Sequence, residues 1–552
     1  MPFILQNILH PISNFWVGQL AQANAYFGSS LFVTLILISS VILAIFLNTL
    51  RQLVLPRKFN SPPEVFHWLP FIGSAIAYGD NPLQFYFDCQ QKYGDVFTFV
   101  LFGRRITVAL GAQGNNFILG GKSTVFNAED AYRHLTTPVF GRDVIYDVPN
   151  EVLMEQKKFI KVGLSADNLR SYVGMIEEEV NEFIKRDPNF SLYQENDNKK
   201  WGSFDVVTAL SEITILTASR TLQGKEVRDH LDKSFADLYA DLDGGFTPIN
   251  LMFPNLPFES SRRRDLAQNT MSNFYVDIIK KRRASGNNRE PDMIAALIEQ
   301  QYRNGRALSD REIAHLMIAL LMAGQHTSTA TGSWTILHLA ANPDVAEALY
   351  KEQVERFMGP DGKMRSPTYE DIRSLPVLDS VIRETLRMHP PIHSIMRYVR
   401  EDVAIPATLS APSEDSVYVI PKGNYVFACP AVSQTDPKIW KNSDKWEPYR
   451  WSDQEGVAAQ AYKAYLNENG EKIDYGFGAV SKGTESPYQP FGAGKHRCIG
   501  EQFAYLQLGT IISTLVRAME LKIAKVPDHN YHTLIVMPKE PRIIHYRRRR
   551  LD

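Results

Sequence analysis

The longest apolar pattern lies near the N-terminus, where a predominantly apolar run of 20 residues extends from Leu31 to Leu50. A helix of that length spans about 30 Å at 1.5 Å per residue, which matches one hydrocarbon core. No Asp, Glu, Lys or Arg precedes Arg51, whereas Arg51, Arg57 and Lys58 follow the run. The pattern predicts a single-pass transmembrane helix at about 31–50, and the positive-inside rule places the chain beyond it in the cytosol.

Two alternatives concern this segment. A cleaved signal peptide is disfavoured because the run is long, begins about thirty residues into the chain and lacks a basic leading region. Residues 3–27 carry no charge and are broken by Pro11, so they either lie along the membrane interface or form a disordered tail. We expect residues 1–50 to act as a membrane anchor.

A proline-rich stretch follows the anchor. Pro56, Pro62 and Pro63 cannot continue a helix, so we expect residues 51–63 to form a stiff connector. Beyond it helical patterns dominate, although β-branched and aromatic residues around a Gly-Arg pair in Tyr93–Leu110 predict a hairpin. Length alone allows three or four domains, but we find no internal repeat and no long low-complexity linker. We therefore expect residues 64–552 to form one large, mainly α-helical domain with a small β region.

A long buried helix is predicted from Ser309 to Asn342. Ser309 and Glu312 fit a capping box, and Pro343 ends the pattern. Residues 316–323 are apolar on all sides, as expected of a helix that crosses a core. Polar residues then follow Gly324, which costs about 1 kcal/mol relative to alanine within a helix.

This interruption in the helix suggests a functional site. Thr327 is placed to donate a hydrogen bond to the carbonyl of Ala323, four residues earlier, which would loosen the helix and leave a notch for a small ligand and water. The alternative is a simple helix bend with a satisfied core histidine and threonine.

Composition excludes some classes of protein. Three cysteines in 552 residues, Cys89, Cys429 and Cys498, cannot build a disulfide framework, and an odd number leaves at least one free thiol. That fits a reducing compartment. The formal net charge of −1 gives no footprint for a nucleic-acid partner.

The segment FGAGKHRCIG, Phe491–Gly500, places one cysteine in a glycine-punctuated loop. Its glycines allow positive φ and close backbone approach, so that amide N–H groups can point at the Cys498 sulfur. The cationic surroundings favour a thiolate. The alternative is a glycine-rich turn around a buried, inert cysteine.

This segment resembles the haem-thiolate signature of the cytochrome P-450 superfamily, which it matches at Phe491, Gly494, His496, Cys498 and Gly500. The resemblance implies a cytochrome P-450 fold that binds haem b, with the iron held by the Cys498 thiolate. It also implies that Thr327 and His326, together with water, deliver protons during oxygen activation.

A further motif is the Glu384/Arg387 pair, which says little by itself because such pairs are common on helices. Together with Arg450, in the segment WEPYRW, it resembles the buried Glu-Arg-Arg triad of the superfamily. The implied role is structural, on the proximal side of the haem.

Four segments also resemble the sterol 14α-demethylases, especially those of fungi: Tyr132–Pro149, Gly245–Asn250, Gln325–Ser328 and His393–Arg397. The resemblance implies removal of the 14α-methyl group of lanosterol or eburicol in three steps that use O2 and NADPH, in ergosterol biosynthesis. It further implies a membrane protein of the endoplasmic reticulum that takes electrons from a separate NADPH-cytochrome P-450 reductase, with cytochrome b5 as a second candidate donor and azoles as inhibitors. No nucleotide-binding glycine fingerprint occurs in the chain itself.

The resemblance assigns residues to three groups. Those expected to bind the haem propionates are Tyr132, Tyr146, Lys157, Arg397 and His496. Those expected to contact the sterol are Tyr132, Phe140, Ile145, Tyr146, Phe246, Ala323, Gly324, His393, Ser394, Ile395 and Leu534. The reductase is expected to meet the proximal surface around Lys482, Lys495 and Arg497.

Two other functions stay open. A cytochrome P-450 that acts on another lipid would keep the haem residues without needing the loop from Tyr132 to Tyr146. A haem-thiolate protein that is not an oxygenase, such as a peroxide isomerase or a gas sensor, would need neither Thr327 nor a reductase.

Overall fold

The computed structural model describes residues 29–549, except for residues 56–58, 196–197, 232, 247–252, 254–255, 286–291 and 464–482. Residues 1–28 of the predicted anchor, part of the predicted connector, residues 247–250 and Lys482 therefore lie outside the described residues.

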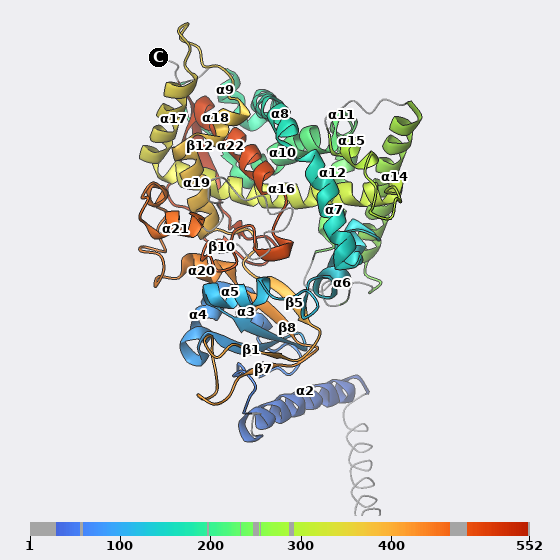
Figure 1. The fold of residues 1–552 in the computed structure, drawn as a ribbon. Helices are drawn as coiled ribbons and strands as arrows, with labels where there is room; N and C mark the ends of the chain where they lie inside the picture. Colours follow the sequence, from blue (N-terminus) through green and yellow to red (C-terminus); the bar gives the residue numbers. More distant parts are fainter. Residues whose placement is uncertain are drawn as a thin grey trace, which may run out of the picture.

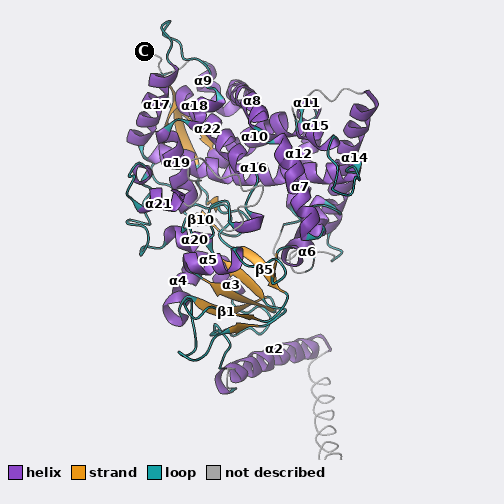
Figure 2. Cartoon of the chain, viewed as in Figure 1, coloured by secondary structure: helices purple, strands orange, loops and turns teal. Residues whose placement is uncertain are grey.

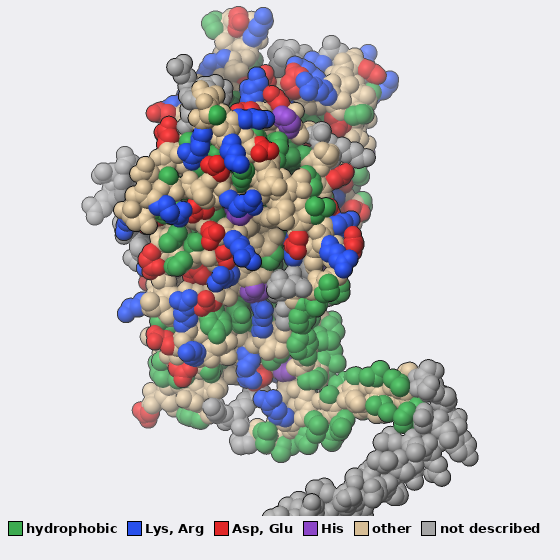
Figure 3. Space-filling view, turned by 90° about the vertical axis from the view of Figure 1, so that its right-hand side faces the viewer, with side chains coloured by type: hydrophobic (Ala, Val, Ile, Leu, Met, Phe, Trp, Pro, Cys, Tyr) green, Lys and Arg blue, Asp and Glu red, His purple; other side chains and the backbone are tan. Residues whose placement is uncertain are grey.

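The predicted membrane helix is α2 (Ser29–Val54), of which Phe32–Val54 is long and apolar enough to cross a membrane. It extends one turn beyond the expected end at Leu50, because nothing in that turn breaks a helix. Its side chains face outward, and Figure 3 shows hydrophobic side chains covering α2 and the adjoining end of the body. Asn48 and Gln52 donate hydrogen bonds to the backbone carbonyl of His67, each over 2.8 Å, so the end of α2 contacts the body.

Within the described residues the β region consists of four small sheets, whose strands are drawn in orange in Figure 2. The largest has the order β1-β2-β8-β5-β3: β1 (Val96–Leu101), β2 (Arg104–Ala109), β8 (Tyr425–Ala428), β5 (Ile395–Val399) and β3 (Phe126–Asn127). The others are β4 (Gly202–Asp205), β12 (Ile543–Arg548) and β9 (Met519–Lys522); β10 (His529–Asn530) and β11 (Met537–Pro538); β6 (Val403–Ala404) and β7 (Val419–Ile420).

The predicted hairpin is confirmed as β1 and β2, which pair from Val96↔Ala109 to Leu101↔Arg104. The turn has positive φ at Phe102 (48°) and Gly103 (75°), as a two-residue hairpin loop requires.

Helices form most of the rest of the described body (Figure 1). Those before the long central helix are α3 (Ala75–Asp80), α4 (Pro82–Tyr93), α5 (Gly111–Leu119), α6 (Glu129–Phe140), α7 (Asn150–Gly163), α8 (Ala166–Arg186), α9 (Ser191–Gln194), α10 (Val206–Ala218), α11 (Lys225–Asp229), α12 (Lys233–Asp243), α14 (Glu259–Ser285) and α15 (Met293–Ile298). The central helix and those after it are α16 (Asp310–Ala341), α17 (Pro343–Phe357), α18 (Tyr369–Arg373), α19 (Pro376–Met388), α20 (Pro430–Thr435), α21 (Val457–Lys463) and α22 (Glu501–Ala518).

The central helix α16 confirms the sequence prediction. Ser309 caps it, and both hydrogen bonds of the capping box with Glu312 are formed. It crosses the middle of the molecule in Figure 1 and packs against α10, α14 and α22. Its apolar residues from Leu316 to Ala319 are buried, as expected of a helix inside a core.

Candidate active site

The loop from Phe491 to Gly500 is held in a conformation that needs its glycines. Gly492 and Gly494 both have a φ of 68°, a region that residues with side chains rarely adopt. A Cβ on Gly494 would lie 2.2 Å from the carbonyl oxygen of Leu119. The amide of Cys498 donates to the carbonyl of Phe491 over 3.0 Å and closes the loop. The sequence thus presents Cys498 on a tight backbone turn beside α5.

The Cys498 thiol is surrounded by protein yet accessible. Burial raises its pKa, while a hydrogen bond from the Gly500 amide and the charges of Lys157 and Arg497 act to lower it. The residue is nevertheless exposed. Both observations fit a sulfur that faces a space inside the fold. An amide donor and two cations are the surroundings that favour a metal-binding thiolate.

A half-buried lysine and a buried arginine lie near this thiol without a carboxylate partner among the described residues. Lys157 donates to the carbonyls of Lys495 (3.0 Å) and Arg497 (2.8 Å), and burial lowers its pKa to about 8. Arg397 is 4% exposed and donates to the carbonyl of Met396 over 2.8 Å. Charges held away from water are normally paired, so these two cations predict an anionic ligand.

Two tyrosines and a histidine stand beside the cations. The rings of Tyr132 and Tyr146 are stacked, with centroids 5.0 Å apart, and burial raises the pKa of both, that of Tyr146 to about 12. The Tyr132 hydroxyl accepts a hydrogen bond from the Met396 amide over 2.8 Å and keeps its own proton to donate. Burial and the nearby cations hold the pKa of His496 well below its usual range.

These residues fit haem. A flat dianion with a central metal would bring two propionates to Lys157 and Arg397, which have no carboxylate partner in the described part of the chain, and iron to the Cys498 sulfur. Tyr132, Tyr146 and His496 add groups that can donate hydrogen bonds to the same carboxylates. The structure thus brings together the residues that the sequence assigned to cofactor binding.

The buried apolar surface of α16 is interrupted at the predicted notch. Ala323 is exposed although Leu321 and Met322 are buried, and open space lies beside Gly324. The Thr327 hydroxyl donates to the carbonyl of Ala323 over 2.7 Å, as the sequence predicts. The helix therefore presents a polar, accessible turn within an otherwise apolar segment.

His326 has two partners that sequence reasoning missed. Its Nε2 lies 2.9 Å from the Tyr239 hydroxyl and 3.0 Å from a carboxylate oxygen of Asp243, both on α12. The Asp243 side chain is 50% exposed, whereas that of His326 is 22% exposed. The arrangement links the polar turn of α16 to a carboxylate that meets solvent. No local pattern signals a contact between helices so distant in sequence.

The loop after α6 carries several residues predicted to contact substrate. Phe140 packs edge-on against Phe246 with centroids 5.8 Å apart. Ile145 has a φ of 55°, a strained conformation for a β-branched residue. Gln156, fully buried, accepts from the Ile145 amide over 2.8 Å and donates to the carbonyl of Asp143 over 2.9 Å. This glutamine holds the strained loop and was not identified from the sequence.

The remaining predicted substrate contacts lie on two segments. His393, Ser394 and Ile395 are half-buried at the start of β5, where Ser394 bonds to His393 over 2.8 Å. Burial lowers the pKa of His393 to about 4, so its ring is neutral near pH 7. Leu534 lies between β10 and β11 and is 53% exposed.

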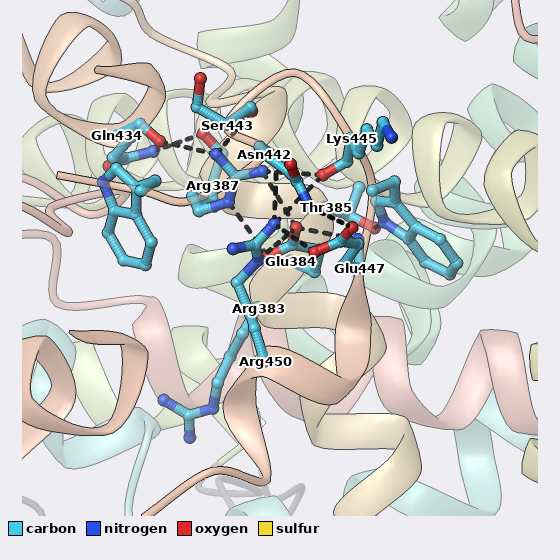
Figure 4. Close-up of polar contacts among 12 residues, drawn as sticks. Arg383, Glu384, Thr385, Arg387, Gln434, Asn442, Ser443, Lys445, Glu447 and Arg450 are labelled. Carbon is cyan, nitrogen blue, oxygen red and sulfur yellow. Dashed lines mark hydrogen bonds and ion pairs between the residues drawn. The ribbon is translucent and has the colours of Figure 1, made fainter. Parts of the chain in front are cut away.

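The predicted triad is formed, as Figure 4 shows. Glu384 and Arg387 have no exposed side-chain surface, and Arg387 donates to both carboxylate oxygens of Glu384 over 2.9 and 3.0 Å. Arg450 donates to the same carboxylate over 2.9 Å, and the amide of Glu447 does so over 3.0 Å. Arg450 also donates to backbone carbonyls of the loop between α20 and α21 and to the Glu447 carboxylate. The triad ties that loop to α19.

One prediction about the proximal surface is wrong. Arg497 is 4% exposed and its guanidinium pairs with Glu501 over 2.6 Å, so it is not available to a docking partner. The ion pair with Glu501 and a hydrogen bond to the Gly492 carbonyl hold the Arg497 side chain inward, while Lys495 is exposed.

A family model described as Cytochrome P450 matches residues 63–546. Three relatives illustrate the similarity. The chain is 56% identical over 520 residues to a lanosterol 14-alpha demethylase of Mycosarcoma maydis, covering 92% of this chain and 91% of the relative. It is 47% identical to a sterol 14-alpha demethylase of Aspergillus fumigatus, covering 94% and 98%. It is also 47% identical to a lanosterol 14-alpha demethylase of Schizosaccharomyces pombe, covering 92% and 98%.

A solved structure supports the fold. The cyanobacterial CYP120A1 with retinoic acid bound superposes with a TM-score of 0.71 at 20% sequence identity, over 89% of this chain and 100% of that one. At that identity the likeness concerns the fold alone.

Proposed function

The chain belongs to the cytochrome P450 family, and from that premise we propose that it is a sterol 14α-demethylase of the fungal type. Its relatives with that name share 47–56% of its residues over nearly the whole chain. The reaction removes the 14α-methyl group of a sterol such as lanosterol in three steps that consume O2 and NADPH, and it belongs to ergosterol biosynthesis.

The observation that carries the haem assignment is a pair of cations, one half-buried and one buried, that have no carboxylate partner in the described part of the chain and lie beside an accessible thiol. Lys157 and Arg397 would hold the propionates, with Tyr132, Tyr146 and His496 donating to the same groups. Cys498 would hold the iron through its thiolate. When bound, haem b supplies an iron centre that activates O2, with electron density donated by the thiolate.

The residues of α16 would transfer protons and leave room beside the helix. Ala323 and Gly324 leave room on the helix surface, and the Thr327 hydroxyl can hold a water or pass a proton while it remains bonded to the Ala323 carbonyl. His326 stands between this turn and the exposed carboxylate of Asp243. We assign to Asp243 and His326 the supply of protons from solvent.

The residues around the site suit a sterol, which is a rigid apolar body with one polar end. Phe140, Ile145, Phe246, Ile395 and Leu534 offer apolar surface. His393 is neutral, and because its Nδ1 is bonded to Ser394, its Nε2 offers the sterol one donor or one acceptor. Such a lining, with few polar groups, is typical of small-molecule sites.

We also propose where the protein acts and with which partners. The helix α2 would cross the membrane of the endoplasmic reticulum with the catalytic body in the cytosol, since Arg51 lies in the last turn of the helix and Arg57 and Lys58 follow it, whereas no Lys or Arg precedes it. Electrons would come from NADPH through a separate cytochrome P-450 reductase, or in part from cytochrome b5. Lys495 is an exposed cation on the cysteine loop that an acidic partner could meet. Azoles would bind in the same site as the sterol.

A reconstituted assay tests the function against its alternatives. Full-length protein, reductase and NADPH are combined with lanosterol, eburicol or a long-chain fatty acid, and the products are identified. We expect 14-demethylated sterol and little fatty-acid oxidation. Preferential fatty-acid oxidation would indicate a different lipid substrate, and haem binding without reductase-dependent oxygen consumption would indicate a haem-thiolate protein that is not an oxygenase.

A further inference from the structure

Three histidines outside the predicted site form a hydrogen-bonded chain inside the fold. His338 lies in α16, His389 directly follows α19, and His529 begins β10. Nε2 of His338 lies 2.7 Å from Nε2 of His389, and Nδ1 of His389 lies 2.7 Å from Nε2 of His529. The three rings, which we call the histidine chain, join two helices to the β10–β11 hairpin.

Aromatic rings enclose the histidine chain. Trp334 stacks on His389 with centroids 4.0 Å apart and planes 4° apart. Trp446 stacks on His338 at 4.9 Å, and Tyr531 stacks on His529 at 5.4 Å. Burial lowers the pKa of His338 to about 3 and that of His529 to about 4, and it holds that of His389 well below its usual range. All three rings are therefore neutral near pH 7.

Neutral rings fix the direction of every hydrogen bond in the histidine chain, because each carries one donor and one acceptor. The carbonyl of Met388 accepts a hydrogen bond from His529, and since Nε2 of that ring faces His389, we assign the donor to Nδ1. Nε2 of His529 then accepts from Nδ1–H of His389. Nε2 of His389 in turn accepts from Nε2–H of His338. Each ring thus specifies the tautomer of the next.

The histidine chain ends at the segment that carries a predicted substrate contact. Residues 531–536 connect β10 to β11 and include Leu534, which is 53% exposed. At one end Tyr531 contacts His529 and lies 6.3 Å from the ring of His393. At the other end the Val536 carbonyl accepts from Trp334 Nε1 over 3.1 Å, and its amide donates to the Pro391 carbonyl over 3.0 Å. Both anchors of the segment thus involve the histidine chain or its stacking partner.

We propose that the histidine chain positions residues 531–536 against the sterol and so sets sterol affinity, while taking no part in the chemical step. This inference rests on the proposed function for its ligand. The three histidines are positioning residues, since the histidine chain acts on the sterol through Tyr531 and Leu534. Replacing one ring by an apolar ring leaves its neighbours with buried polar atoms that lack partners, so the segment would shift or loosen.

Variants of His529 in the full-length, haem-loaded protein test this proposal. His529→Phe keeps an aromatic ring against Trp334 and Tyr531 but removes both hydrogen bonds. His529→Gln keeps one donor and one acceptor. His532→Gln is the matched control, because His532 is exposed on the same segment. Lanosterol affinity is measured by titration of the Soret band, and kcat and KM are measured with reductase.

We expect His529→Phe to weaken lanosterol binding and raise KM by about tenfold, within the coupling found for residues of one network, with kcat unchanged. His529→Gln should recover part of the loss, and His532→Gln should behave as wild type. The effects of His529→Phe and Leu534→Ala should be less than additive, because one acts through the other. Unchanged affinity in His529→Phe, a fall in kcat with unchanged KM, or strictly additive effects would overturn the proposal.

Amide hydrogen exchange separates this proposal from the proposed function. In the sterol-free protein, exchange within residues 531–536 should be faster in His529→Phe than in wild type, and an unchanged rate would contradict the positioning role whatever the substrate is. If His529→Phe loses the thiolate spectrum, His338→Asn tests the opposite end of the histidine chain, with the same expected rise in KM. A wild-type protein that binds no sterol would instead refute the proposed function.

Discussion

Replacement of Glu384 by glutamine should be the most destabilising isosteric change in the triad. The Glu384 carboxylate accepts from Arg387, Arg450, the Glu447 amide and the indole of Trp451, all over 2.9–3.0 Å. Glutamine would turn an amide donor toward these donors and leave the fully buried Arg387 without its counter-ion. Removing one partner of a buried pair costs about 3–5 kcal/mol.

The expected shift in thermal midpoint follows from the size of the body. At about 2 cal/mol/K per residue, the roughly 490 residues of the catalytic body have an unfolding entropy of about 1 kcal/mol/K. A loss of about 3–5 kcal/mol should therefore lower the midpoint by about 3–5 °C. The midpoint is measured as loss of the reduced carbon-monoxide band at its thiolate position.

Glu447→Gln is the matched control for this experiment. Glu447 also pairs with Arg450, over 3.2 Å, but its side chain is 41% exposed, and exposed pairs contribute about 0–1 kcal/mol. The thermal midpoint of Glu447→Gln should fall by less than about 1 °C. Equal shifts for Glu384→Gln and Glu447→Gln would refute the argument that burial makes the triad stabilising.

Other predictions concern the relay, the propionate cluster, the anchor and the histidine chain. Thr327→Ala should keep the thiolate spectrum and lower sterol turnover by about 10²–10⁴-fold, with NADPH consumption diverted to peroxide; full coupling would withdraw the relay assignment. Tyr146→Phe should keep haem and change lanosterol or azole affinity in Soret titrations, whereas complete haem loss would show a structural role. Deleting residues 1–54 should leave a haem-loaded body with an unchanged carbon-monoxide band, since α2 carries no residue of the site; loss of that band would contradict this. Because His338, His389 and His529 have pKa values below those of the unfolded chain, stability should be full above about pH 6.5 and fall toward pH 4 by about 1.4 kcal/mol per pH unit for each histidine. Asp528, Lys539 and Arg387 also face these rings, so the slope is compared with that of His529→Phe, and identical slopes would contradict the prediction.

The sequence predicted those features that local patterns determine. The capping box of Ser309 and Glu312, the Thr327 bond to Ala323 and the hairpin of β1 and β2 each depend on residues close together in the chain. Family resemblance supplied the residues that we propose for cofactor and substrate binding. The fold class is confirmed by the family match and by the solved structure.

Contacts between distant elements could not be predicted in this way. Asp243 reaches His326 from another helix, and Gln156 holds the strained backbone at Ile145 through side-chain hydrogen bonds. The inward turn of Arg497 depends on its ion pair with Glu501 and on the packing of the cysteine loop. The histidine chain gathers residues from three separate elements, so no spacing rule reveals it.

The most direct test of the central claim follows the carbon that the reaction removes. Lanosterol labelled at the 14α-methyl carbon is turned over by the full-length protein with reductase, NADPH and O2, with Cys498→Ser as the control. We predict labelled formate and 14-demethylated sterol in equal amounts, and neither product from Cys498→Ser, which loses the thiolate spectrum. Lanosterol recovered with its label intact, from wild-type protein that shows a normal thiolate spectrum and accepts electrons from the reductase, would contradict the account.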